Sequence, residues 1–164
     1  MTQEQMVKVG MADLAVISGD NILKTTGLGS CVGLTLYDKV SRVAGMAHVM
    51  LPSSDIAREG KLNIAKYADT AIPEMIEQMQ RLGAVLHRME AKMAGGAQMF
   101  AFGGNNDTMR IGPRNVDSCK EILLRFRIPI AAEDTGANYG RTIEFNSATG
   151  MLTIRSVQHG MKEI

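Results

Sequence analysis

The sequence predicts an α+β fold, an α/β sandwich in which helices pack on a mixed, largely antiparallel β-sheet. Two observations predict this class. Short segments rich in β-branched residues are interspersed with two amphipathic helical segments. Most neighbouring strand segments are also joined by turns too short for a helical crossover, which favours antiparallel pairing. The 164 residues suit one domain, residues 1–164, and no linker, repeat or low-complexity tract divides them.

The first half of the chain predicts two hairpins. "LAVIS" (14–18) and "ILKTT" (22–26) flank "GDN", a turn signal, and are predicted to pair. "VGLTLYD" (32–38) and "VAGMAHVM" (43–50) flank "KVSR" and predict a second hairpin. The strand 43–50 is nearly continuous in apolar residues, so we expect it to be buried.

Two helices are predicted from apolar residues at helical spacing. The first covers about 66–82, and Pro73 within it predicts a kink or a fresh helix start. The second covers about 115–126, with Asn115 as a candidate N-cap and Cys119 on its apolar stripe. We therefore expect Cys119 to be a buried, space-filling thiol.

The remaining strands are predicted in the second half of the chain. They are "HRMEAKMAG" (87–95), "IPIAAED" (128–134), and "RTIEFN" (141–146) joined by "SATG" to "MLTIRSV" (151–157). The segments "FGGNND" (102–107) and "DTGANYGR" (134–141) are rich in Gly and Asn and either line a site or only turn the chain; we expect turns.

Composition excludes several classes of protein. A net charge of +1, 4% aromatic residues and no Trp argue against a nucleic-acid partner. No apolar run reaches the roughly 18 residues that span a bilayer, and the N-terminus carries no leader pattern, so we expect a cytoplasmic protein without membrane insertion. Two cysteines and three histidines without C-x-x-C or H-E-x-x-H spacing predict reduced thiols, no metal site and no cofactor.

The stretch "GLGSC" carries the main candidate chemistry. Cys31 follows glycines at 27 and 29, directly ahead of a predicted strand. Glycines permit backbone conformations that leave amide N–H groups uncovered by side chains. The amides around Gly29 and Ser30 are therefore candidates for an oxyanion hole beside a cysteine nucleophile.

A cysteine nucleophile needs a base, because the thiolate is the attacking species. His48, in an otherwise apolar strand, is the candidate. If a two-residue loop pairs Asp38 with Ser41, Cys31 lies directly opposite His48 on the same face of the hairpin. A loop of odd length would instead place the two on opposite faces, unless a bulge at Gly29 or Ser30 restores the shared face.

Two further questions remain open at this level. Thr25 or Thr26 could orient the imidazole, but the two side chains point to opposite faces of a strand, so only one can serve. Gly27, Gly29 and Gly33 also resemble a dinucleotide-binding fingerprint. That match is weak, because the fingerprint must open a helix and these residues precede a strand pattern.

The chain also resembles the CheD family of bacterial and archaeal chemotaxis, over about residues 8–157. The segments that carry the resemblance, in order, are "GLGSCVGLTLYD", "GMAHVMLP", "KYADTAIPEMIEQM", "GGAQMF", "IGPRN", "EDTGANYGRTIEF" and "TGMLTIRSV". The resemblance implies a fold related to bacterial toxin deamidases.

The resemblance further implies a chemoreceptor glutamine deamidase, which converts receptor glutamine side chains to glutamate and releases ammonia without a cofactor. It implies Cys31 as nucleophile, His48 as base and Thr25, rather than Thr26, as the third residue. Its implied partners are methyl-accepting chemotaxis receptors as substrates and a phosphatase of the CheC type. The alternative is a non-catalytic interaction module that binds and regulates that phosphatase. Ala137 stands where we expect a second glycine from the resemblance.

Overall fold

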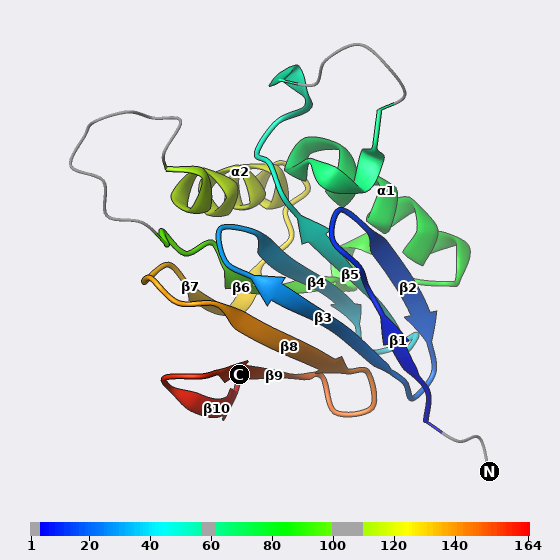
Figure 1. The fold of residues 1–164 in the computed structure, drawn as a ribbon. Coiled ribbons are helices and arrows are strands. Elements are labelled where there is room, and N and C mark those ends of the chain that lie inside the picture. The colour runs from blue at the N-terminus through cyan, green and yellow to red at the C-terminus, as the bar shows by residue number, and fades with distance from the viewer. Residues whose placement is uncertain (1–3, 57–61, 100–109) are drawn as a thin grey trace.

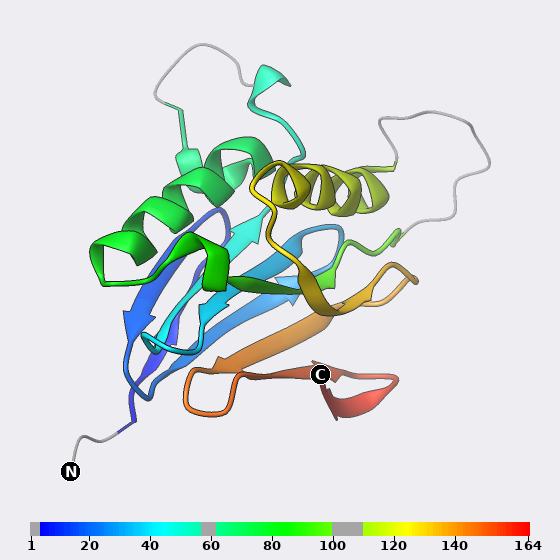
Figure 2. The same ribbon diagram turned by 180° about the vertical axis from the view of Figure 1, so that it is seen from behind.

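The protein forms three layers: two helices, a central sheet and an outer sheet (Figures 1 and 2). The computed structural model describes residues 4–56, 62–99 and 110–164, and the predicted turn at 102–107 lies outside them. The strands of the outer sheet, in spatial order, are β1 (Met6–Lys8), β3 (Ile22–Leu28), β8 (Arg141–Asn146), β9 (Met151–Ser156) and β10 (Gly160–Glu163). Those of the central sheet are β2 (Leu14–Ser18), β5 (Val43–Val49), β4 (Val32–Asp38), β6 (Glu90–Gly95) and β7 (Ile130–Thr135).

The predicted class is confirmed, because both sheets are mixed and largely antiparallel. Only the pairs β1–β3 and β6–β7 are parallel among the described strands. The hairpins β4–β5 and β8–β9 form as predicted. The division into two stacked sheets, however, was not part of the sequence prediction.

The predicted hairpin between 14–18 and 22–26 is wrong. β2 pairs with β5 in the central sheet, whereas β3 pairs with β1 and β8 in the outer sheet. Ile17 and Leu23 are both buried in the core between the sheets, so the two strands face each other across the layers instead of lying edge to edge. The turn between them therefore carries the chain from one sheet to the next.

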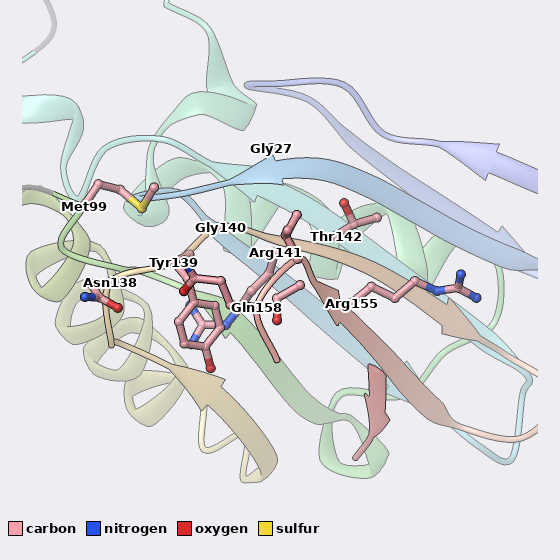
Figure 3. A pocket seen from close by; sticks show the side chains of 11 residues that line it. Gly27, Met99, Asn138, Tyr139, Gly140, Arg141, Thr142, Arg155 and Gln158 are labelled. Carbon is pink, nitrogen blue, oxygen red and sulfur yellow. The ribbon is translucent and has the colours of Figure 1, made fainter. Parts of the chain in front are cut away.

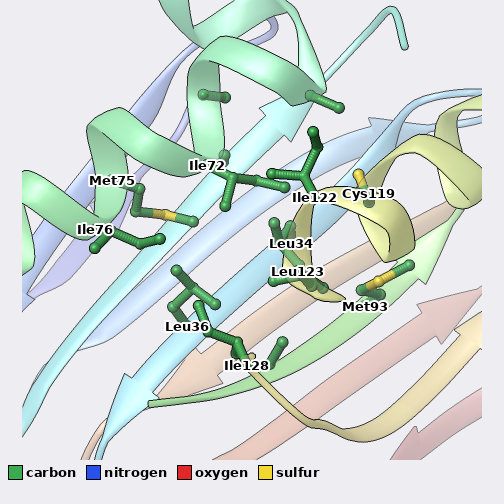
Figure 4. Packing of buried hydrophobic residues seen from close by; sticks show 14 of the residues in the cluster. Leu34, Leu36, Ile72, Met75, Ile76, Met93, Cys119, Ile122, Leu123 and Ile128 are labelled. Carbon is green, nitrogen blue, oxygen red and sulfur yellow. The ribbon is translucent and has the colours of Figure 1, made fainter. Parts of the chain in front are cut away.

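Side-chain alternation along the central sheet divides the core in two. Val32, Leu34 and Leu36 of β4 point toward the helices, where they meet residues such as Ile72 and Leu123 (Figure 4). The intervening residues of β4 point into the space between the sheets. That second space also contains the candidate site.

The helices cover the face of the central sheet that points away from the outer sheet. Both helices begin at residues other than the predicted ones. They are α1 (Ala68–Arg81) and α2 (Ile111–Arg125), accompanied by 3-10 turns at Ser54–Ile56, Ile64–Lys66 and Leu86–Arg88. α1 runs through Pro73, its sixth residue, so the predicted fresh start there is wrong. α2 begins before Asn115, which is buried inside the helix and is not its cap. Cys119 is fully buried in the core, as predicted.

Among the described residues, no helix combines the length and the hydrophobicity needed to cross a membrane.

Candidate active site

The three residues singled out in the sequence all lie at the space between the two sheets. Thr25 lies on β3 of the outer sheet, His48 on β5 of the central sheet, and Cys31 directly before β4. Their exposed fractions are 2%, 0% and 7%. A hydroxyl, an imidazole and a thiol are thus nearly excluded from water in one region.

The register of the β4–β5 hairpin differs from the predicted one. Its loop has four residues, so Asp38 pairs with Val43 and His48 lies opposite Gly33, not opposite Cys31. The shift is by an even number of residues, so Cys31 and His48 keep the same face of the sheet. Cys31 precedes the first pair of this ladder, and it is a diagonal neighbour of His48 if the alternation of the strand continues through it.

Gly33, opposite His48, allows the two sheets to approach closely at this point. A Cβ atom at Gly33 would lie 2.4 Å from Cδ1 of Ile143 and 2.9 Å from Cδ1 of Leu28, both in the outer sheet. These distances are shorter than van der Waals contact. The missing side chain therefore lets β3 come near enough for Thr25 to reach His48.

The contact between Thr25 and His48 joins the two sheets. Oγ1 of Thr25 lies 2.7 Å from Nδ1 of His48 and 2.7 Å from the carbonyl oxygen of Val9. The carbonyl oxygen can only accept, so the hydroxyl donates to Val9, and Nδ1–H of His48 donates to the hydroxyl. Thr26 is exposed, which resolves the choice between the two threonines in favour of Thr25 as the residue that meets the histidine.

This network leaves the other imidazole nitrogen as an acceptor. With the proton on Nδ1, Nε2 of His48 carries the lone pair, and it has no hydrogen-bond partner among the described residues. A buried polar atom without a partner is uncommon and often marks a functional position. Burial lowers the pKa of His48 and keeps its ring neutral.

The thiol of Cys31 is likewise held in its neutral form. Burial raises its pKa from the ordinary value of 9.0, although a hydrogen bond with its own backbone acts in the opposite direction. The structure therefore contains a neutral thiol and a neutral imidazole, not a resting ion pair. Proton transfer to Nε2 would have to accompany attack by the sulfur.

The turn before Cys31 holds its carbonyl groups and leaves the amides of Ser30 and Cys31 without a partner in any other described residue. Gly27 has φ +73°, and its carbonyl accepts from the amide of Gly29 at 3.1 Å. The amide of the candidate Gly29 is therefore already used. The N–H groups of Ser30 and Cys31 donate to no other described residue. These two amides bond to no other described residue and are therefore the candidates for binding a developing oxyanion, whereas that of Gly29 is already used.

Two other site types are not supported here. The glycines at 27 and 29 lead into strand β4, not into a helix, so the dinucleotide-fingerprint alternative is wrong. In the part of the chain that the structure describes, no group of three or more His, Cys, Asp or Glu side chains could hold a metal ion.

A cavity of about 620 Å³ begins at the turn that precedes Cys31. Gly27 and Met99 both line it, and Cγ of Met99 lies 3.4 Å from the position of a Cβ on Gly29. Residues 138–142 and 155–158 form the rest of its wall, with Met99 and Arg155 far apart in the view (Figure 3). The sequence did not predict this cavity: of the two interpretations of "DTGANYGR", a turn or the lining of a site, the pattern favours the turn, and residues 138–141 of this segment line the cavity.

Arg141 fixes the shape of the loop at 134–140, whose last three residues line the cavity. Its guanidinium donates to Asp134 and to the carbonyls of Gly136 and Tyr139, and lies 4.3 Å from the centre of the Tyr139 ring. Ala137 in the same loop has φ +59°, a left-handed conformation that favours glycine. Ala137 therefore adopts a backbone conformation that glycine reaches more easily than alanine.

Hydrolases with a cysteine nucleophile use three groups: a thiol, an imidazole with one nitrogen free to accept its proton, and a polar group that bonds to the other nitrogen. The buried thiol, the neutral imidazole and the hydroxyl found here correspond to these groups. Fold and site together define an α+β protein with a candidate thiol hydrolase site. A family model described as "CheD chemotactic sensory transduction" matches residues 50–156. The chain belongs to the CheD family.

Relatives of similar length agree with this membership. A protein of Halalkalibacterium halodurans named chemoreceptor glutamine deamidase CheD is 55% identical over 159 residues, which are 97% of this chain and 98% of that protein. The protein of the same name from Bacillus subtilis is 49% identical over 163 residues, which are 99% of this chain and 98% of that protein. The similarity thus extends over nearly the whole length of each protein.

Proposed function

We propose that this protein is a chemoreceptor glutamine deamidase that converts glutamine side chains of methyl-accepting chemotaxis receptors to glutamate. Family membership and the names of its relatives support the reaction. The observation that carries the catalytic assignment is the chain from the Val9 carbonyl through Thr25 to His48, which leaves Nε2 free. The enzyme acts in the cytoplasm.

Cys31 is the nucleophile in this proposal and His48 the general base. Nε2 takes the thiol proton while sulfur attacks the carboxamide carbon, and the amides of Ser30 and Cys31 bind the resulting oxyanion. The protonated imidazole donates to the leaving nitrogen, ammonia departs and a thioester remains. His48 then activates a water molecule, which hydrolyses the thioester to glutamate and the free thiol.

Thr25 orients the base and stabilises its charged form. When His48 is protonated at both nitrogens, Nδ1–H still donates to Oγ1, whose own proton remains on the Val9 carbonyl. The receptor segment that carries the glutamine lies in the cavity beginning at Gly27 and Met99. A phosphatase of the CheC type is the further partner, as the family resemblance implies.

The direct test is deamidation of a purified receptor fragment by the purified chain. Each converted glutamine gains about one dalton and releases one ammonia, and both signals should vanish in Cys31→Ala, because an activated thiol is required. Cys119→Ala is the matched control: that thiol is fully buried among core residues, and burial raises its pKa to about 12. It should retain activity in proportion to its folded fraction.

The outcomes separate the two functions under consideration. Full activity in Cys31→Ala would refute the nucleophile. An interaction module without catalysis predicts that wild type and Cys31→Ala release no ammonia and bind the phosphatase equally well.

A further inference from the structure

Asn115 joins the turn that carries Cys31 to the end of the strand that carries His48. Its side chain is fully buried in α2, and Nδ2 lies 3.0 Å from the carbonyl oxygen of Ser30 and 3.0 Å from that of Met50. Ser30 directly precedes Cys31, and Met50 follows His48 by two residues. One amide group therefore connects the backbones of both segments.

These two carbonyls lie just beyond the end of a β-ladder. The pair Val32–Val49 ends the ladder between β4 and β5 on the side of Cys31. Ser30 and Met50 lie beyond this pair, so they are not paired with each other in the sheet. Both residues are partly buried, and a backbone carbonyl withdrawn from water needs a donor within the protein. The Asn115 amide supplies one to each and extends the connection between the two segments past the last rung of the sheet.

The bond to Ser30 also determines where the amide of Cys31 points. The carbonyl of Ser30 and the N–H of Cys31 belong to one planar peptide unit, in which they point in opposite directions. Holding the oxygen toward α2 directs the N–H away from the helix. The neighbouring carbonyls of Cys31 and Gly29 accept from the backbone amides of Gly96 and Ala97. Of the donors to these three consecutive carbonyls, Asn115 is the one that is a side chain.

The remaining atom of the side chain indicates that this arrangement has a cost. Oδ1 of Asn115 is buried and has no hydrogen-bond partner among the described residues. Rotating the amide would place this oxygen against two carbonyl oxygens, so the present orientation is the only one that satisfies both. Asparagine inside a helix is also intrinsically unfavourable. Packing alone would be served better by an apolar residue.

We propose that Asn115 is a positioning residue that orients the Ser30–Cys31 peptide and fixes its distance from His48. The proposal rests on the proposed catalytic roles of Cys31 and His48. Because Asn115 acts through the backbone of the turn, its loss should impair the chemical step more than substrate binding.

Two variants and one matched control test this role. Asn115→Ala removes both bonds, and Asn115→Asp keeps the size of the side chain but presents an oxygen in place of Nδ2. Ser118→Ala is the control, because Ser118 lies on the same helix and also donates to a loop carbonyl, that of Pro52, at 2.6 Å. All three proteins are first compared with wild type by thermal unfolding, so that kcat is expressed per folded molecule.

We expect both Asn115 variants to lower kcat ten- to hundredfold while KM changes less than threefold, since small misplacements of reacting groups cost about this much. The rate at which iodoacetamide alkylates Cys31, followed against pH by peptide mass spectrometry, should change in both variants and remain at the wild-type value in Ser118→Ala. If Asn115→Ala fails to fold, Asn115→Asp carries the test.

The proposal is overturned if the folded Asn115 variants keep kcat within twofold of wild type, or if Ser118→Ala loses as much. Failure of the proposed function looks different. In that case wild type shows no deamidation that depends on Cys31, whatever happens at Asn115. The alkylation profile still reports on the turn under those conditions, and an unchanged profile in both variants also refutes the positioning role.

Discussion

Replacing Thr25 by valine tests the orientation of the imidazole most directly. Valine has nearly the same shape as threonine, so packing between the sheets is preserved, but the hydroxyl is lost. Two buried groups then lose their partner: Nδ1–H of His48 and the carbonyl oxygen of Val9, each at 2.7 Å from Oγ1 in the wild type. The ring is no longer forced to keep its proton on Nδ1.

The size of the effect follows from these two groups. Leaving a buried donor or acceptor unpaired costs about 1–3 kcal/mol, so the free energy of unfolding should fall by about 2 kcal/mol or more. The same loss of one hydrogen bond to the charged ring predicts a decrease in kcat of about ten- to a hundredfold. Removing the base itself in His48→Ala should cost more, about 10²–10⁴-fold.

Two measurements check this prediction. Steady-state ammonia release from a receptor fragment gives kcat, and nitrogen NMR of labelled histidine reports which ring nitrogen of His48 carries the proton. Thr25→Ser is the control, because it keeps the hydroxyl and should lose much less activity than Thr25→Val. The reasoning is refuted if the valine variant keeps both the Nδ1–H tautomer and wild-type kcat, or if serine is as damaging as valine.

Three further predictions concern pH, stability and binding. The pH profile of kcat/KM should have an acid limb below 6.5 and an alkaline limb above 9.0, because burial lowers the pKa of His48 and raises that of Cys31; a narrower profile would contradict the neutral pair. Burial alone would raise the pKa of Asp38, but hydrogen bonds from Arg88 and nearby amides lower it from 3.8 to about 2. Because the pKa is lower in the folded state than in the unfolded state, Asp38 contributes about 2 kcal/mol to the free energy of unfolding above pH 3.8, and this contribution is lost as pH falls toward 2. Urea unfolding of Asp38→Asn should therefore lack this acid dependence. Arg155→Glu should raise KM about tenfold with kcat nearly unchanged, since Arg155 lines the cavity without an ion-pair partner among the described residues; an unchanged KM would exclude the cavity as the receptor site.

The face shared by Cys31 and His48 could be predicted from the sequence, although the register could not. Strand alternation places both residues on one side of a hairpin for any even shift, and the four-residue loop produces such a shift. The exact partner of His48 depends on the loop and on the close approach of the outer sheet at Gly33. That approach involves Leu28 of β3 and Ile143 of β8, and Ile143 is distant in sequence from the hairpin.

Neither the role of Asn115 nor the stacking of the two sheets could be predicted from local sequence patterns, because both depend on contacts between distant segments. A polar residue ahead of an apolar stripe has the pattern of a helix cap, and only the tertiary structure reveals that α2 starts earlier and aims this side chain at two carbonyls. Likewise, 14–18 and 22–26 have the pattern of a hairpin, and only the burial of both strands between the layers separates them into two sheets. In both cases, contacts between distant segments decided among structures that the local pattern allowed.

The neutral state of the thiol and imidazole explains why the positions of uncharged groups matter in the proposed reaction. Attack by Cys31 would convert two neutral groups into an oxyanion and an imidazolium inside a region nearly closed to water, where each new charge is costly without a donor or acceptor. In the proposed reaction the imidazolium would meet the oxygen of Thr25, and the oxyanion would meet the amides of Ser30 and Cys31. The two charges would thus be stabilised from different layers of the fold: by the outer sheet on one side, and by the turn that is hydrogen-bonded to Asn115 of α2 on the other. A site of this kind requires all three layers, which accounts for its assembly from segments spread over most of the chain.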